Sequence, residues 1–149
     1  MGHITSDRQK YEPILRGFIG KTCHHSIACN SIKIRFEKKD KLKRQGYIWI
    51  DPPWSFMQNG ELIADAYLCP HYEDIDYRLR FQEWCNLFHP LNQSIFTGYE
   101  FLEDNSLHLS FHDSYQIHIP KYEDCSSDED PEQWYLQWYA SPFQEEQAN

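Results

Sequence analysis

Cysteine and histidine, two common zinc ligands, gather at two places in the chain. Cys23, His24, His25 and Cys29 form the first group, and Cys69-Pro70-His71 forms the second. Neither group has the Cys-x-x-Cys or His-Glu-x-x-His spacing of zinc motifs. We therefore expect buried thiols and surface histidines, with no metal and no cofactor. A small metal-dependent hydrolase that uses Cys23, His24, His25 and His71 stays open as an alternative.

Other patterns that would carry chemistry are incomplete. Residues 17–22, Gly-Phe-Ile-Gly-Lys-Thr, have two residues between the glycines where a phosphate-binding loop needs four. The sequence has no serine nucleophile elbow and no ordered Ser/His/Asp signature. We therefore predict no catalytic residue and expect that the protein is not an enzyme.

Cysteine usage and hydropathy indicate the compartment. The five cysteines form an odd set at irregular spacings, and residues 1–21 lack the apolar core of a secretion signal. No apolar run approaches the ~18 residues that suggest a membrane span. These features predict a cytoplasmic protein with free thiols and no membrane partner.

The hydrophobic pattern predicts an α+β fold, with a mostly antiparallel twisted sheet of six to eight strands and one main amphipathic helix packed on it. The helix is expected over residues 73–88, where Asp74 is in position to cap it. Its apolar face is formed by Tyr77, Phe81, Trp84, Cys85 and Phe88. The predicted strands are residues 31–37, 47–50, 62–68, 95–103, 106–112, 115–120 and 133–139.

The length of the chain is typical of a single domain, which we expect to span residues 1–149. Pro13 interrupts the polar segment 1–16, which is predicted to be a mobile start or a short helical turn. Residues 140–149 are expected to form a disordered tail.

One hairpin allows its register to be predicted. A three-residue connection, His112-Asp113-Ser114, places Leu109 opposite Ile117, so that both side chains face the core. The same register places His108 opposite His118 on the polar face. Two imidazoles in this arrangement could bind a metal ion or respond to pH, and two solvated side chains are the simpler interpretation.

Charge is distributed unevenly along the chain. Residues 1–50 contain eleven Lys and Arg against four Asp and Glu, whereas residues 51–149 contain three against nineteen. The basic run 38–44 is predicted to be a solvated hairpin tip, and residues 123–132, with six carboxylates, an exposed acidic loop. Such an acidic surface repels nucleic acid and anionic lipid and attracts cationic proteins, so no direct nucleic-acid partner is expected.

The predicted binding site combines these carboxylates with aromatic residues. Trp and Tyr are favoured anchors at protein interfaces, and carboxylates around them raise the association rate with a basic partner. The alternative is that the rings fill the core and the acids provide solubility. The candidate partner-binding residues are Glu103, Asp104, Glu123, Asp124, Asp128, Glu129, Asp130, Glu132, Trp134 and Trp138.

The order of elements in residues 95–139 resembles that of small bacterial immunity proteins. The strand Ser106-Leu-His-Leu-Ser-Phe111 is followed by a short turn, by Tyr115-Gln-Ile-His-Ile119, by the acidic loop and by Glu132-Gln-Trp134-Tyr-Leu136. Tyr47–Trp54 adds a looser similarity. The family in question protects bacteria from their own contact-dependent growth-inhibition toxins.

This resemblance implies a non-enzymatic protein that binds a cognate toxin domain in the cytoplasm, often a cationic nuclease, and covers its active site or substrate surface. The charge distribution leads to a compatible expectation, because carboxylates suit a groove that receives phosphates. An acidic, phosphate-mimicking antagonist of a host nucleic-acid-binding enzyme is the alternative binding hypothesis.

Overall fold

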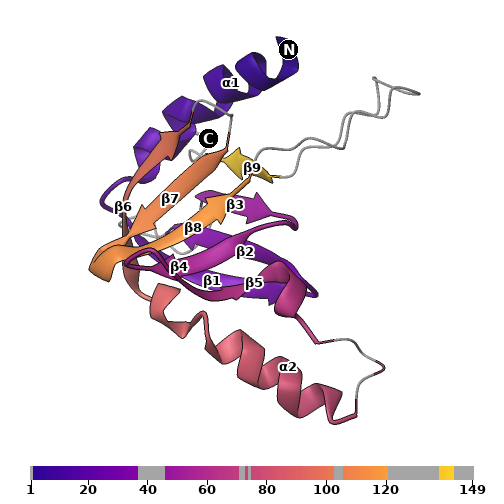
Figure 1. Ribbon diagram of the computed structural model, residues 1–149. Coiled ribbons are helices and arrows are strands. Elements are labelled where there is room, and N and C mark those ends of the chain that lie inside the picture. The colour runs from indigo at the N-terminus through magenta and orange to yellow at the C-terminus, as the bar shows by residue number, and fades with distance from the viewer. Residues whose placement is uncertain are drawn as a thin grey trace, which may run out of the picture.

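The computed structural model describes residues 2–36, 46–70, 73, 75–102, 106–120 and 138–142. Within these residues the chain forms one antiparallel sheet of nine strands, two α-helices and three short 3-10 turns (Figure 1). The predicted α+β fold with a helix packed on an antiparallel sheet is confirmed. None of the helices in these ranges is both long and apolar enough to cross a membrane.

The elements follow one another in an order that is mainly β-hairpins. The first half contains α1 (Gly2–Phe18), β1 (Thr22–Ala28), β2 (Ser31–Phe36), β3 (Gly46–Ile50), β4 (Ser55–Gln58) and β5 (Glu61–Asp65). The second half contains η1 (Ala66–Leu68), α2 (Tyr77–Asn86), η2 (His89–Leu91), β6 (Ser94–Phe101), β7 (Leu107–Phe111), η3 (His112–Ser114), β8 (Tyr115–Ile119) and β9 (Trp138–Ser141). Across the sheet the strands lie in the order β5-β4-β8-β7-β6-β1-β2-β3-β9.

The two faces of the sheet differ because side chains alternate along each strand. We call the face that packs against the helices the inner face and the opposite one the outer face. The inner face is apolar, and most of its side chains are fully or almost fully buried. Its side chains include Cys23, Ile32, Ile34, Phe36, Ile48, Ile50, Phe56, Phe96, Leu107, Leu109, Phe111, Ile117 and Ile119.

Helix α1 covers the inner face beside β6 and β9. Tyr11, Leu15 and Phe18 are buried and lie at the i, i+4, i+7 spacing of one helical face. The Phe18 ring stacks on that of Phe36, with centroids 4.1 Å apart. The expectation of at most a short helical turn in this segment is therefore wrong: the helix continues through Pro13, because burial of this stripe offsets the hydrogen bond that proline removes.

Helix α2 and η2 cover the other end of the same face, so the two helices lie at opposite ends of the sheet (Figure 1). Trp84 and Phe88 are buried with their ring centroids 5.0 Å apart, and Phe88 also contacts Trp54 and Phe56 at 5.3 and 5.4 Å. The predicted apolar face is confirmed, although the helix begins at Tyr77 rather than near residue 73.

The cap of α2 differs from the prediction. Asp76 occupies the N-cap position with a left-handed backbone (φ 61°) and makes no side-chain capping bond. Asp74, the expected cap, lies outside the described residues.

The register predicted for the β7–β8 hairpin is confirmed. Leu109 pairs with Ile117 and His108 with His118, across the three-residue connection His112–Ser114. Asp113 adopts a left-handed conformation with φ 61°, which aspartate tolerates better than most residues. Burial of the apolar set on the inner face thus selects the turn length.

Several strands differ from the prediction. Strands β1 and β4 were not expected, which is why the sheet has nine strands instead of six to eight. The strand predicted over 62–68 ends at Asp65, where the chain enters η1. Strand β9 extends to Ser141, into the segment expected to be a tail. The basic run 38–44, the acidic residues 123–132, most of the predicted strand 133–139 and residues 143–149 lie outside the described residues.

Candidate partner-binding surface

The predicted binding residues divide unequally between the described and the remaining parts of the chain. Trp138 is described. The other nine lie outside the described residues, namely Glu103, Asp104, Glu123, Asp124, Asp128, Glu129, Asp130, Glu132 and Trp134. The structure therefore describes this site only through the residues that flank two acidic segments in the sequence, 103–104 and 123–132.

Those flanking residues lie at one end of the sheet. Leu102 and Ser106, on either side of Glu103 and Asp104, are joined by a backbone hydrogen bond of 2.9 Å. Beside them Phe101 pairs with Leu107, and Leu107 pairs with Ile119, the last residue of β8 before the long acidic segment.

The first residue described after segment 123–132 also lies near Phe101. Its first described residue is Trp138, whose ring centroid lies 6.1 Å from that of Phe101. The described residues on either side of both acidic segments therefore lie around Phe101, although a complete β-hairpin separates the two segments in the sequence.

Trp138 itself lies on the inner face. It pairs with Ile50 in the β3–β9 ladder, is half-buried, and its ring packs 5.2 Å from that of Tyr11 on α1. The next residue, Tyr139, points to the outer face because side chains alternate. Packing of Trp138 against α1 consequently holds the start of β9 on the inner face.

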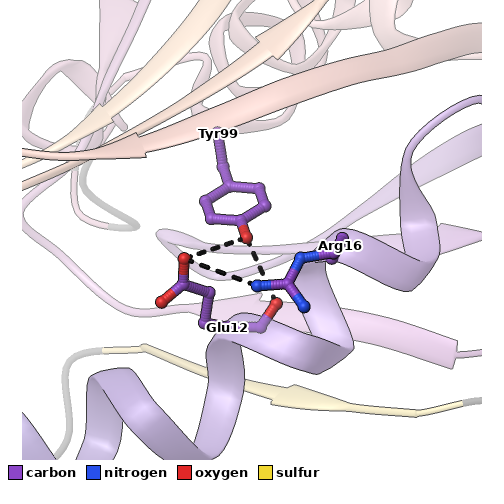
Figure 2. A network of polar contacts seen from close by, with 3 residues as sticks. All are labelled: Glu12, Arg16 and Tyr99. Carbon is purple, nitrogen blue, oxygen red and sulfur yellow. Dashed lines mark hydrogen bonds and ion pairs between the residues drawn. The ribbon is translucent and has the colours of Figure 1, made fainter.

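A polar network holds α1 in this position (Figure 2). The hydroxyl of Tyr99 on β6 lies 3.4 Å from the backbone carbonyl of Glu12 and 3.3 Å from its carboxylate Oε2. The same carboxylate lies 3.7 Å from the Arg16 guanidinium. Burial, followed by the negative charge of Glu12, raises the pKa of the Tyr99 phenol, which keeps it neutral and able to donate.

The outer face of β2, β3 and β9 carries a basic and aromatic patch that the sequence analysis did not identify. The Lys33 Nζ lies 4.3 Å from the centroid of the Tyr47 ring, and the Tyr47 and Tyr139 rings meet edge to face at 6.0 Å. Burial and then a hydrogen bond with Tyr47 raise the pKa of Tyr139. Alternation had already placed Lys33 on the polar face, but only the β3–β9 pairing brings Tyr139 beside Tyr47.

The cysteine and histidine residues of the first group are separated by alternation. Cys23 lies on the inner face, where burial raises its pKa to about 12 and its Sγ lies 3.4 Å from the Leu91 carbonyl. His24 pairs with Arg35 on the outer face. His25 is bonded to Asn92 at 2.9 Å, and burial is the main cause that lowers its pKa.

Three other thiols approach one another. The Cys69 Sγ lies 3.5 Å from the backbone carbonyl of Cys29. Burial, followed by the proximity of Cys85 and Cys29, raises the pKa of Cys69. Among the described residues, no group of three or more His, Cys, Asp or Glu side chains is placed to hold a metal ion. His71, the fourth residue of the hydrolase hypothesis, lies outside that part of the chain.

The outer face also has an open depression of about 390 Å³ over β6, β7 and β8. Its polar lining includes Asn59, Thr97, Ser110 and Gln116.

No protein-family model, no curated protein and no solved structure matches the chain. Its function is therefore inferred from its own charges and contacts.

Proposed function

We propose that the protein is an immunity protein that binds a basic toxin domain in the cytoplasm and covers its active or substrate-binding surface. One observation carries the proposal: the described residues that flank the carboxylate-rich segments 103–104 and 123–132 in the sequence lie at the same end of the sheet, around Phe101. Beyond Arg80 the sequence contains thirteen carboxylates and a single basic residue, Lys121. An excess of carboxylates of this size favours a partner that is positively charged.

The expected partner is a nuclease-type toxin domain. A surface that binds nucleic acid is lined by Lys and Arg, which attract phosphates. Carboxylates on the immunity protein would occupy those positions and exclude the substrate. Complementary charges of this kind mainly raise the association rate, while packed aromatic groups slow dissociation.

The test uses the C-terminal domain of the protein encoded immediately upstream of this chain. In the variant, Asp128, Glu129, Asp130 and Glu132 are replaced by their amides. The control replaces four other acids, Glu61, Glu73, Glu83 and Asp113, all exposed and all in other parts of the chain. Both variants change the net charge equally, so only the position of the removed charges differs.

We expect the variant to associate several-fold more slowly than the control in stopped-flow measurements at low salt. The difference should shrink near 1 M salt, where the Debye length is ~3 Å. Equal association rates for the two variants would remove the assigned role of the acidic segment. Failure of the parent protein to bind the toxin domain or to protect cells that express it would exclude the immunity function.

A further inference from the structure

His108 and His118 face each other on the outer face of the sheet. They are direct partners in the β7–β8 ladder, and their ring centroids lie 4.5 Å apart with the rings nearly perpendicular. Both side chains are partly exposed. The two imidazoles thus lie side by side and are each partly accessible to solvent, with Nδ1 of His118 buried.

The backbone beneath this pair is firmly held. Strands β7 and β8 lie inside the sheet, with β6 on one side and β4 on the other. On the inner face the neighbouring side chains Leu107, Leu109, Ile117 and Ile119 are at most 1% exposed. The two imidazoles are therefore preorganised, and binding a shared ligand requires little ordering of the chain.

The surroundings of the pair favour a cation. Glu100 on β6 is the ladder partner of His108, and Ser55 on β4 is the partner of His118. A carboxylate one strand away attracts a positive ion. The next pair along the same face, Ser110 and Gln116, is joined by a 3.3 Å hydrogen bond, so the neighbouring polar side chains bond to each other.

We propose that His108 and His118 form a two-nitrogen site for divalent transition-metal ions. Imidazole nitrogen suits Cu²⁺, Ni²⁺ and Zn²⁺, with Cu²⁺ bound most tightly in the Irving–Williams order, whereas Mg²⁺ and Ca²⁺ prefer oxygen ligands. Two histidines leave the other coordination positions to water or to a donor from another molecule. This site rests only on the β7–β8 pair and its neighbours, and does not depend on the proposed function.

The test measures Ni²⁺ binding by calorimetry, because Ni²⁺ does not oxidise thiols. Reactive cysteines are first alkylated with iodoacetamide. His3 is replaced by Ala in every protein, including the reference, so that an imidazole near the N-terminal amine does not compete. We expect the reference to bind one equivalent of Ni²⁺. His108→Ala and His118→Gln should each lower the Ni²⁺ affinity by at least ~10-fold, because even residues that only hydrogen-bond to a metal ligand typically contribute that much.

His112→Ala is the matched control, because His112 is an exposed single histidine at the end of the same hairpin. It should bind Ni²⁺ as the reference does. Unchanged affinity in His108→Ala would overturn the proposal, as would an equal loss in His112→Ala.

A measurement on the reference protein, in which His108 and His118 are both present, avoids any effect of their substitution on folding. Ni²⁺ is paramagnetic, and sub-stoichiometric amounts should broaden amide NMR signals around residues 108 and 118 first. Broadening centred elsewhere would assign the ion to another site and contradict the proposal. Mg²⁺ at the same concentration should leave the spectrum unchanged.

Discussion

The inner and outer faces of the sheet are built from the same strands but perform different tasks. On the inner face, apolar side chains pack beneath one helix or the other, and most of them are almost completely buried. On the outer face, half-exposed polar and aromatic side chains meet in pairs, such as Lys33 with Tyr47 and His108 with His118. Substitutions at neighbouring residues of one strand therefore probe the stability of the core and the properties of the exposed surface separately.

The difference also concerns the size of the energies. Burial of an apolar side chain contributes in proportion to the area removed from water, and a cavity adds to the loss when that side chain is truncated. Pairs on a solvated face contribute less, because water competes for each partner. Substitutions on the inner face should accordingly lower the free energy of unfolding more than substitutions on the outer face.

The largest difference is expected between two neighbouring residues of β7. Leu109 is fully buried, and Leu109→Ala should lower the free energy of unfolding by ~2–5 kcal/mol. His108→Ala, on the outer face of the same strand, should change it by only ~0.5 kcal/mol. Urea unfolding followed by circular dichroism measures both, and similar losses for the two variants would contradict the division of the faces.

The second prediction compares a thiol on the inner face with one in an exposed turn. Burial raises the pKa of Cys23 from its ordinary value of 9.0 to about 12, which lowers its thiolate fraction near neutral pH by ~1000-fold. Iodoacetamide should therefore modify the exposed Cys29 rapidly and leave Cys23 intact in the folded protein, as peptide mass spectrometry would show. Rapid modification of Cys23 under native conditions would place it outside the core.

The same pKa shift has a consequence for alkaline stability. The thiolate of Cys23 is disfavoured in the folded chain, so unfolding is favoured where that thiol can ionise. The contribution to stability is complete below about pH 9.0 and is lost as the pH rises towards about 12. Compared with the parent, Cys23→Ala should lose less unfolding free energy between pH 8 and pH 11.

The third prediction uses glycine as a test of close packing on the inner face. A Cβ at Gly46 would lie 2.5 Å from the Phe18 ring and 3.0 Å from the Ser141 carbonyl. Gly46→Ala should therefore cost ~1–3 kcal/mol, because the ring and two strands have to move. Gly98→Ala is the control, since a Cβ there has no neighbour within 4 Å and should be neutral or slightly stabilising. Equal thermal stability of the two variants would contradict this packing.

Alternation and turn length predicted the inner face of the second half of the chain well. The Leu109–Ile117 pair and the apolar face of α2 follow from local periodicity and from the need to bury one face. Helix α1 was missed because Pro13 was treated as a break, although Tyr11, Leu15 and Phe18 already show helical spacing.

The arrangement of the candidate sites follows from long-range pairing, which local patterns do not contain. Only the β3–β9 ladder places Tyr139 on Trp49 and beside Tyr47. Likewise, the acidic segments could be recognised from composition, but the proximity of their flanking residues to Phe101 follows only from the β6–β7–β8 register and the contact with Trp138.

The smallest expected effect is on the outer face. Lys33→Met keeps the apolar stem and removes the charge above the Tyr47 ring, so it should cost ~0.5–1 kcal/mol of unfolding free energy. Lys10→Met is the control, because the Lys10 Nζ is exposed and lies farther away, 5.2 Å from the Tyr11 centroid. Both variants remove one positive charge from a chain of net charge −9, so general electrostatics cancels in the comparison. A cost for Lys33→Met as large as that for Leu109→Ala would show that the outer face contributes to stability as a core does.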